Sequence, residues 1–223
     1  MLYRRLCPAL AQGKETQICK FKVDVGFILD SSGSLKDDYQ REKDFLKSLA
    51  GSLGFGPGTT RAGVITFSYH AEHSIKLKDF DSLTSFNNAV DKIPLMGFTT
   101  RIDKALRLAQ KEMYTVENGA RKNVPKILIL LTDGSQSKRG DDVEEPKLIA
   151  DILRSKGIRL VVIGIGSGVK QDELENIAGG QENVYSAASF DQLLSQDFVD
   201  QVTVKECEAG KLHCSICLLM SVV

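Results

Sequence analysis

The sequence predicts an α/β fold in which a doubly wound, mainly parallel sheet lies between two layers of helices. Short apolar runs alternate along the chain with segments whose apolar residues recur at helical spacing. Two of these runs, 126–131 (KILILL) and 160–165 (LVVIGI), are almost entirely apolar, as is typical of strands covered on both faces. Helical segments between strands favour right-handed crossovers, and therefore a parallel sheet with helices on both faces.

The same patterns predict each element in order. Ile102, Ala105, Leu106, Ala109 and Met113, for example, form one helical stripe. The predicted strands are 23–29, 62–67, 74–77, 126–131, 160–165 and 183–185. The predicted helices are 36–53, 82–93, 102–113, 143–153, 172–178 and 190–202. One such sheet uses nearly all of 22–206, so we expect a single domain there. We interpret 1–21 as an N-terminal linker or precursor remnant and 207–223 as a C-terminal tail.

Composition and charge disfavour several classes of protein. The 223 residues contain 29 basic and 29 acidic side chains, without the basic excess of a nucleic-acid-binding protein. The sequence has no basic cluster of the kind that binds anionic membranes, and no apolar run long enough to span a bilayer. A hydrophobic share of 42% at zero net charge argues against disorder. A signal peptide is not evident, because Pro8 interrupts the short apolar patch near the N-terminus.

Polar residues follow two of the predicted buried strands. Asp30, Ser32 and Ser34 alternate directly after the first strand, and Gly33 lets that turn close. Asp133 follows the 126–131 strand. Ligands bind beyond the carboxyl ends of the strands in such sheets, so we expect these side chains to face one site. The alternative interpretation is that they cap the next helix, but a cap needs one such residue rather than three.

Two carboxylates with several hydroxyls make an oxygen-only site, which suits a hard divalent cation. Mg²⁺ fits best, with Mn²⁺ as a substitute. The group contains no His or Cys, which argues against zinc or copper. These residues leave the ion under-neutralised, so it can accept a carboxylate from another molecule. A general base is not evident beside it, so we interpret the site as a binding site rather than a catalytic one.

Three motifs in order resemble those of a von Willebrand factor type A (vWA) domain with a metal-ion-dependent adhesion site: DSSGS, FTTRIDKAL and LTDG. The resemblance covers about 22–206 and is closest to the domains of matrilins and non-fibrillar collagens. It implies a three-layer fold with six strands, five parallel and one short and antiparallel, here 74–77. The implied metal ligands are Asp30, Ser32, Ser34, Thr100 and Asp133, with Thr99 as an alternative to Thr100. The implied ligand-contacting rim consists of Gly97, Thr99, Arg101 and Gly134.

The resemblance also bears on the five cysteines. In extracellular members of this family, cysteines that flank the domain often pair, which implies a disulfide between Cys19 and Cys207. For Cys7, Cys214 and Cys217 we favour pairing with other domains or chains. The alternative is that Cys214-x-x-Cys217 forms half of a zinc site, although a second pair is missing.

The resemblance implies a non-enzymatic, secreted adhesion module. Through its bound cation it would hold an acidic side chain of a matrix or cell-surface protein, with collagen as one candidate. The first alternative is a structural module for matrix assembly without a metal-bridged ligand. The second is a Mg²⁺-dependent phosphotransferase of the haloacid dehalogenase type, which needs an acid where this chain has Ser32.

Three further features have alternative interpretations. Arg139-Gly140-Asp141 is an integrin-recognition tripeptide, but it also fits a solvated loop before a helix. The glycine-rich 164–168 segment resembles a dinucleotide loop, although its spacing favours a strand-to-helix turn. The charge run at 36–44 is expected to be the solvated face of the first helix.

Overall fold

The sheet is the centre of the molecule. A computed structural model describes residues 22–220, with side chains described through residue 208. The strand order is β3-β2-β1-β4-β5-β6, and β3 alone in this sheet is antiparallel to its neighbour. The strands are β1 (Val23–Asp30), β2 (Thr60–Phe67), β3 (Ala71–Ile75), β4 (Lys126–Thr132), β5 (Ile158–Ile165) and β6 (Val184–Ala187). The predicted six-stranded, mainly parallel sheet is confirmed.

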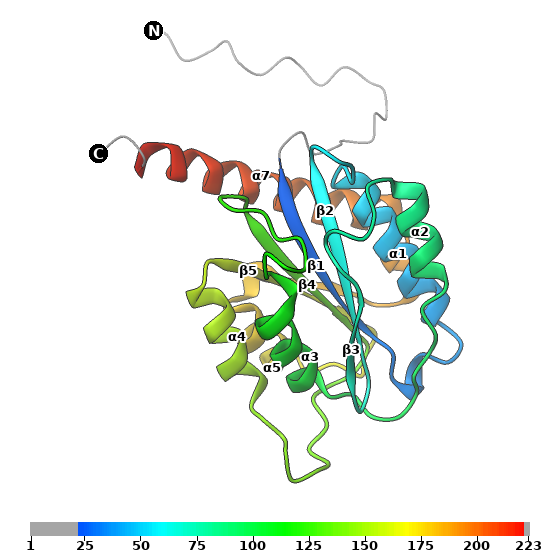
Figure 1. Cartoon of the computed structure of the whole chain (residues 1–223). Helices are drawn as coiled ribbons and strands as arrows, with labels where there is room; N and C mark the ends of the chain where they lie inside the picture. Colours follow the sequence, from blue (N-terminus) through cyan, green and yellow to red (C-terminus); the bar gives the residue numbers. More distant parts are fainter. Residues whose placement is uncertain (1–21, 221–223) are drawn as a thin grey trace, which may run out of the picture.

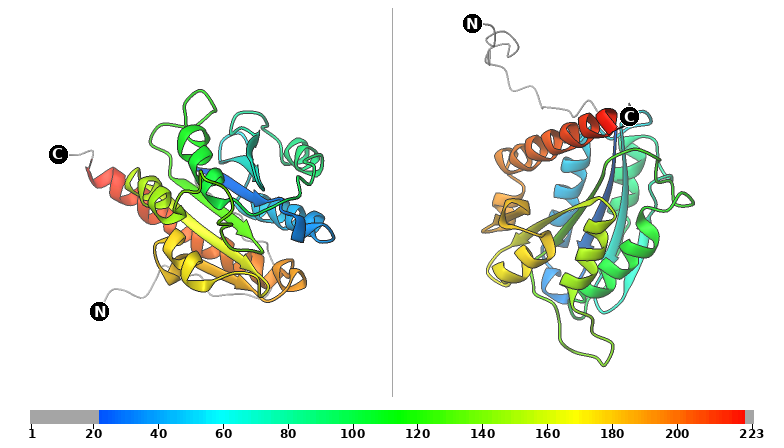
Figure 2. Two further views of the ribbon diagram at one scale, coloured as in Figure 1. Left: turned by 90° about the horizontal axis from the view of Figure 1, so that it is seen from below. Right: turned by 90° about the vertical axis from the view of Figure 1, so that its left-hand side faces the viewer.

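Helices cover both faces of the sheet, which gives the three predicted layers (Figures 1 and 2). One face packs against α1 (Tyr39–Ser52), α2 (Leu83–Asp91), α6 (Phe190–Leu193) and α7 (Gln196–Met220). The other face packs against α3 (Ile102–Leu108), α4 (Pro146–Ser155) and α5 (Gln171–Ala178). Three single turns complete the fold: η1 (Gly33–Leu35), the π-helical η2 (Ala109–Met113) and η3 (Gln181–Asn183).

The side chains of β1 alternate between two hydrophobic cores, one on each face of the sheet. Val25, Phe27 and Leu29 are fully buried against the helices of one face, and Ile28 is fully buried on the other. Gly26 also points to the second face, where a Cβ atom would lie 2.8 Å from the Tyr114 hydroxyl oxygen. The apolar runs of the central strands therefore reflect burial on both faces.

The strand order changes direction at the carboxyl ends of β1 and β4. The chain proceeds outward from β1 through β2 to β3, and outward in the other direction from β4 through β5 to β6. The strand order thus reverses between β1 and β4, which pair in parallel with Leu29 opposite Leu131. Such a reversal is where open α/β sheets bind ligands. It brings Asp30 and Asp133 to the same edge.

Several element boundaries differ from the predictions. The first helix begins at Tyr39 rather than 36, because Gly33–Leu35 form a separate 3₁₀ turn. The short antiparallel strand is Ala71–Ile75 rather than 74–77. The helix predicted at 143–153 begins at Pro146, a residue favoured in the first turn of helices.

The predicted last helix, 190–202, is two helices. α6 ends at Leu193, and the Ser195 side chain accepts a hydrogen bond from the Phe198 amide nitrogen (3.3 Å) near the start of α7. α7 then runs to Met220, through the predicted boundary between the domain and its tail at 206 and 207. None of the helices in the described part of the chain is long and apolar enough to cross a membrane.

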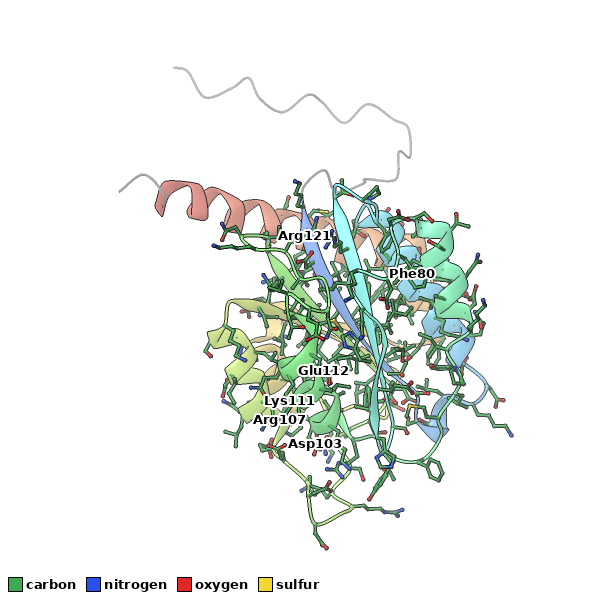
Figure 3. The ribbon with its side chains drawn as sticks, viewed as in Figure 1. Phe80, Asp103, Arg107, Lys111, Glu112 and Arg121 are labelled. Atoms are coloured by element: carbon green, nitrogen blue, oxygen red, sulfur yellow. The ribbon has the colours of Figure 1, made fainter. Side chains whose placement is uncertain are left out.

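The amino edge of the sheet is fixed by a buried ion pair. The Arg121 side chain and amide donate to the two carboxylate oxygens of Asp24, each at 2.7 Å. The Arg121 guanidinium also donates to the carbonyls of Val23 and Thr59, each at 2.8 Å. Figure 3 labels Arg121 at this edge and Asp103 at the opposite one, toward which the carboxyl ends of β1 and β4 point. The two edges therefore have separate polar networks.

Candidate metal centre

The turn after β1 arranges the predicted oxygen ligands around one point. Asp30 is fully buried, and its two carboxylate oxygens accept from the Ser32 amide (2.9 Å) and the Thr132 hydroxyl (2.6 Å). The Ser32 and Ser34 hydroxyl oxygens are 3.1 Å apart, and the Ser34 hydroxyl donates to Asp133 at 3.0 Å. A chain of hydrogen-bonded oxygens thus links β1 to the loop after β4. Asp30 forms the buried floor of the site, and the exposed Ser34 lies at its rim.

The third segment, around Thr100, lies against the same loops. The Thr100 hydroxyl oxygen lies 3.3 Å from where a Cβ atom on Gly134 would be. Gly97 donates from its amide to the Ser31 carbonyl (2.8 Å), and the Gly33 amide donates to the Phe98 carbonyl (3.0 Å). These bonds attach the segment to the turn after β1. The structure therefore brings the predicted segments together.

Thr99 has a different environment from Thr100. Its hydroxyl oxygen is buried and has no hydrogen-bond partner in the described residues. A polar atom in this situation is rare in folded proteins and calls for an explanation. Thr99 therefore stays an alternative ligand to Thr100.

Arg101, predicted at the ligand-contacting rim, needs a correction. Its side chain is fully buried, with two guanidinium nitrogens donating to Asp103 (2.8 and 2.7 Å). The guanidinium also contacts Asp142 in the loop after β4, at 3.0 Å to the carboxylate and 2.9 Å to the carbonyl. Arg101 thus holds two loops of the site together rather than presenting a charge to solvent. The prediction failed because a lone arginine in a loop carries no sequence signal of its buried partners.

Burial and mutual repulsion of carboxylates mark this edge of the sheet. The pKa of Asp30 is raised to about 6, mainly by burial and to a smaller extent by the charge of Asp133, while hydrogen bonds from Thr132 and Ser32 oppose the shift. The pKa of Asp133 is also raised, first by burial, and Ser34 opposes this shift. Two acids that resist ionisation side by side would ionise readily around a cation.

The donor set fits a hard divalent ion. It combines two carboxylates with the hydroxyls of Ser32, Ser34 and Thr100, all of them oxygen donors. Among the described residues there is no group of three or more His, Cys, Asp or Glu side chains that could hold a metal. The two acids would balance the charge of a divalent ion, and five donors would leave a six-coordinate ion such as Mg²⁺ one further position for water or an outside ligand.

Two buried side chains of this region had not been predicted. Thr132 carries the hydroxyl that fixes Asp30, and its signal is a hydroxyl residue at the end of the apolar 126–131 run, next to Asp133. Glu42 is fully buried in α1, and both of its carboxylate oxygens lack hydrogen-bond partners among the described residues. Burial raises the Glu42 pKa well above its ordinary value, and the charges of Asp30 and Asp133 add to the shift. The expected solvated face is therefore wrong at Glu42, and at Lys43, which is 6% exposed.

The glycine-rich 164–168 segment supports the site by close packing. A Cβ atom on Gly168 would lie 2.3 Å from the Asp133 carbonyl oxygen, closer than real Cβ atoms come. The strand-to-helix turn thus needs glycine so that it can pack against the Asp133 backbone. Close packing against the protein backbone therefore explains Gly168, which the dinucleotide-loop interpretation would explain by contact with a bound nucleotide.

The remaining predicted features have mixed outcomes. Arg139, Gly140 and Asp141 are exposed in the long loop that projects after β4 (Figure 1). Cys207 is buried and disulfide-bonded. Cys19 and Cys7 lie outside the described residues, as do the side chains of Cys214 and Cys217, so the predicted pairings stay predictions.

Comparisons with known proteins agree with this architecture. The family model of the von Willebrand factor type A domain matches residues 24–201 of the sequence. The human collagen alpha-6(VI) chain is 35% identical over 188 residues, which are 82% of this chain and 8% of that protein. The von Willebrand factor A domain-containing protein 2 of Xenopus laevis is 29% identical over 97% of this chain and 26% of its own length. The chain thus spans a small part of these relatives.

A solved structure has the same fold. Proximal thread matrix protein 1 from the mussel byssus was solved with zinc in its metal-ion-dependent adhesion site (MIDAS) motif. It superposes on this chain with a TM-score of 0.73 at 31% identity. The match covers 84% of this chain and 47% of that one. Together with the family match over 24–201, these similarities show that the chain belongs to the von Willebrand factor type A domain family.

Proposed function

We propose that this chain is an adhesion module that binds an acidic side chain of a matrix or cell-surface protein through a divalent cation. One observation supports the proposal: hydrogen bonds link Asp30, Ser32, Ser34 and Asp133 where the strand order reverses, Thr100 packs against Gly134 in the same loops, and Ser34 is exposed to solvent. A six-coordinate ion held there by five protein donors keeps one position that faces solvent. A partner's carboxylate fills that position as a further oxygen ligand.

The cation in this proposal is Mg²⁺, with Mn²⁺ as a substitute, held by Asp30, Ser32, Ser34, Thr100 and Asp133. Mg²⁺ prefers oxygen donors and keeps bound water, which suits two carboxylates with neutral hydroxyls. The zinc in the mussel relative supports a divalent ion at the corresponding motif. Gly97, Thr99 and Gly134 would contact the partner around the ion.

A role in the extracellular matrix is part of the same proposal. The relatives named as collagen VI chains and as a thread matrix protein support it, and collagen is a candidate ligand. A disulfide between Cys19 and Cys207 would suit a secreted protein, since disulfides persist in oxidising compartments. We propose no catalytic role, because Ser32 stands where a dehalogenase-type phosphotransferase needs its second acid.

A second candidate function is a structural module for matrix assembly without a metal-bridged ligand. The names of the matrix relatives favour it as much as they favour adhesion. The two differ in whether binding needs the cation. The distinction can therefore be measured directly.

The test is binding of the chain to a panel of immobilised collagens and other matrix proteins, in Mg²⁺ and in EDTA. We expect binding to at least one of them that is lost in EDTA and in Asp133→Ala. The matched control is Asp141→Asn, an exposed acid in the loop after β4, which should bind like the wild type. Equal binding in Mg²⁺ and EDTA would instead favour the structural module.

A further inference from the structure

An exposed aromatic side chain lies beside the candidate metal centre. Phe98 is 81% exposed, among the most exposed of the large apolar side chains in the described chain. Tyr69 (39%) and Leu95 (36%) are also exposed, in loops at the same edge of the sheet. Single exposed apolar residues are ordinary, but a group of them at a binding edge points to a contact surface.

Phe98 also has a conformation that disfavours its residue type. Its φ is +69°, in the left-handed region where a Cβ atom is crowded and glycine is preferred. The position thus keeps an exposed aromatic side chain at the expense of backbone strain. Strain of this kind at a binding loop is an observation from which a function can be inferred.

Hydrogen bonds hold the Phe98 backbone against the metal-binding turn. Its carbonyl accepts from the Gly33 amide (3.0 Å), between the two serines of the candidate site. The Ser31 carbonyl accepts from the Gly97 amide (2.8 Å), and the Ser31 hydroxyl accepts from the Met96 amide (2.7 Å). These bonds fix the Phe98 backbone, so a partner can contact the exposed ring without a large rearrangement of the loop.

Tyr69 is held in the neighbouring loop. The Arg101 amide donates to the Ser68 carbonyl (2.9 Å), which joins the turn after β2 to the segment that carries Phe98 and Thr100. The Lys104 ammonium lies 4.6 Å from the centre of the Tyr69 ring, a cation–π distance that steadies the ring. Aromatic groups therefore belong to two loops that flank the candidate ion.

We propose that Phe98, with Tyr69 in the neighbouring loop, forms an apolar subsite next to the cation. The preferred partner segment then carries a large apolar side chain within two residues of the carboxylate that reaches the ion. This inference rests on the proposed metal-bridged binding and names the kind of segment that it selects. The positive ion fixes the acid, and the adjacent exposed ring buries its apolar neighbour, which is how aromatic residues act as anchors at interfaces.

The test uses the full chain and immobilised synthetic peptides. Each peptide carries one central Glu among Ser and Ala, and a second set replaces one position within two residues of that Glu by Leu, Met or Phe. In Mg²⁺ we expect the second set to bind about tenfold tighter than the first, and both sets to lose binding in EDTA. A third set with Gln in place of Glu should not bind.

Phe98→Gly separates the aromatic ring from the conformation of the loop, because glycine accepts a positive φ without strain. This variant should keep its Mg²⁺ affinity, measured by calorimetry, and lose the tenfold preference. The matched control is Val116→Ala, which removes a side chain that is 85% exposed near the opposite edge of the sheet and should keep the preference.

The outcomes separate the two levels of the proposal. If Glu peptides bind with Mg²⁺ but an apolar neighbour adds nothing, or Phe98→Gly keeps the preference, the apolar subsite is wrong and the proposed function stands. If Glu peptides bind no better than Gln peptides, both are wrong. Binding of the wild type to phosphatidylcholine vesicles, or self-association lost in Phe98→Gly, would assign the ring to a different occupant and overturn the proposal.

Discussion

Asp30 depends on a neighbour that contributes no metal-binding atom. The Thr132 hydroxyl donates to its carboxylate at 2.6 Å, in a place where neither side chain reaches solvent. This bond favours the ionised carboxylate and fixes its orientation, so it prepares Asp30 to bind a cation. Asp30 and Thr132 end adjacent strands, and the hydrogen bond therefore follows from the strand pairing.

Thr132→Val should weaken Mg²⁺ binding about 10- to 100-fold, the usual effect of losing a residue that orients a metal ligand. The metal-free protein should also lose about 1–3 kcal/mol of unfolding free energy, because a buried carboxylate oxygen loses its partner. Calorimetric Mg²⁺ titration and urea unfolding measure the two effects.

Thr66→Val is the matched control, since Thr66 is also buried and loses a comparable bond, to the Ser74 hydroxyl at 2.7 Å. It should keep the Mg²⁺ affinity of the wild type. Equal losses of affinity in both variants would show that Thr132 acts through general stability rather than through Asp30.

The burial of Glu42 should make the stability of the protein depend on pH. Its pKa in the folded protein lies well above the ordinary 4.5, because burial and the charges of Asp30 and Asp133 disfavour the carboxylate. Its contribution to stability is therefore complete below the unfolded pKa and is lost as pH rises toward the folded pKa. Glu42→Gln does not titrate, so the variant should gain stability relative to the wild type as pH rises from 4.5.

Urea unfolding in EDTA at pH 5 and at pH 8 measures this difference. The control is Glu72→Gln, at an exposed position on β3, which removes a surface acid instead of a buried one. A pH-independent difference for Glu42→Gln would contradict the burial of an unpartnered acid beneath the site.

At the scale of elements, the turn after β5 supports the loop after β4. A Cβ atom on Gly168 would lie 2.3 Å from the Asp133 carbonyl oxygen, and backbone atoms cannot move aside as a flexible side chain can. Gly168→Ala should therefore cost about 1–3 kcal/mol of unfolding free energy, as overpacking does. It should also weaken Mg²⁺ binding, because the Asp133 backbone must shift.

Gly58→Ala is a suitable control, since nothing lies within 4 Å of a Cβ atom at that position. Thermal unfolding and Mg²⁺ titration compare the two variants. Wild-type affinity in Gly168→Ala would show that the loop after β4 adapts without moving Asp133.

The predictability of the fold varied with the kind of signal. The two central strands were predicted nearly to their ends, since burial on both faces leaves an unmistakable apolar run. The break near Ser195 was missed because the apolar spacing continues across it. The one residue that marks the start of the new helix is Ser195, which accepts from the Phe198 amide. The strand β3 was placed three residues late, because an edge strand carries a weak apolar pattern.

The candidate site shows the same division. Its acids and hydroxyls were expected from three short motifs, two of which follow strand ends while the third directly precedes α3. Buried partners such as Thr132, and the pairing of Arg101 with Asp103, could not, since they depend on which loops the folded chain brings together. Glu42 was mistaken for a surface acid because local charge spacing does not reveal which helix face is buried.

At the scale of the whole molecule, the doubly wound topology places the acids at one edge and the chain ends of the domain elsewhere. α7 is anchored by the fully buried Glu206, which accepts from Arg159 at 2.6 and 3.1 Å.

Binding a cation to the folded form alone stabilises the folded protein by mass action. At 100 times the dissociation constant, Mg²⁺ should thus add about 2.7 kcal/mol to the unfolding free energy.

Thermal unfolding in EDTA and across a Mg²⁺ series measures this stabilisation. The transition should move upward with each increase in Mg²⁺, and Asp30→Ala should remove the dependence. A transition that ignores Mg²⁺ in the wild type would mean that the folded site does not hold the ion.

The most direct measurement is a calorimetric titration of Mg²⁺ into the wild type, Asp30→Ala and the control Asp141→Asn. We expect one binding event in the wild type and in Asp141→Asn, and none in Asp30→Ala. Absence of binding in the wild type, or equal binding in Asp30→Ala, would contradict the assignment of this edge of the sheet as a metal centre.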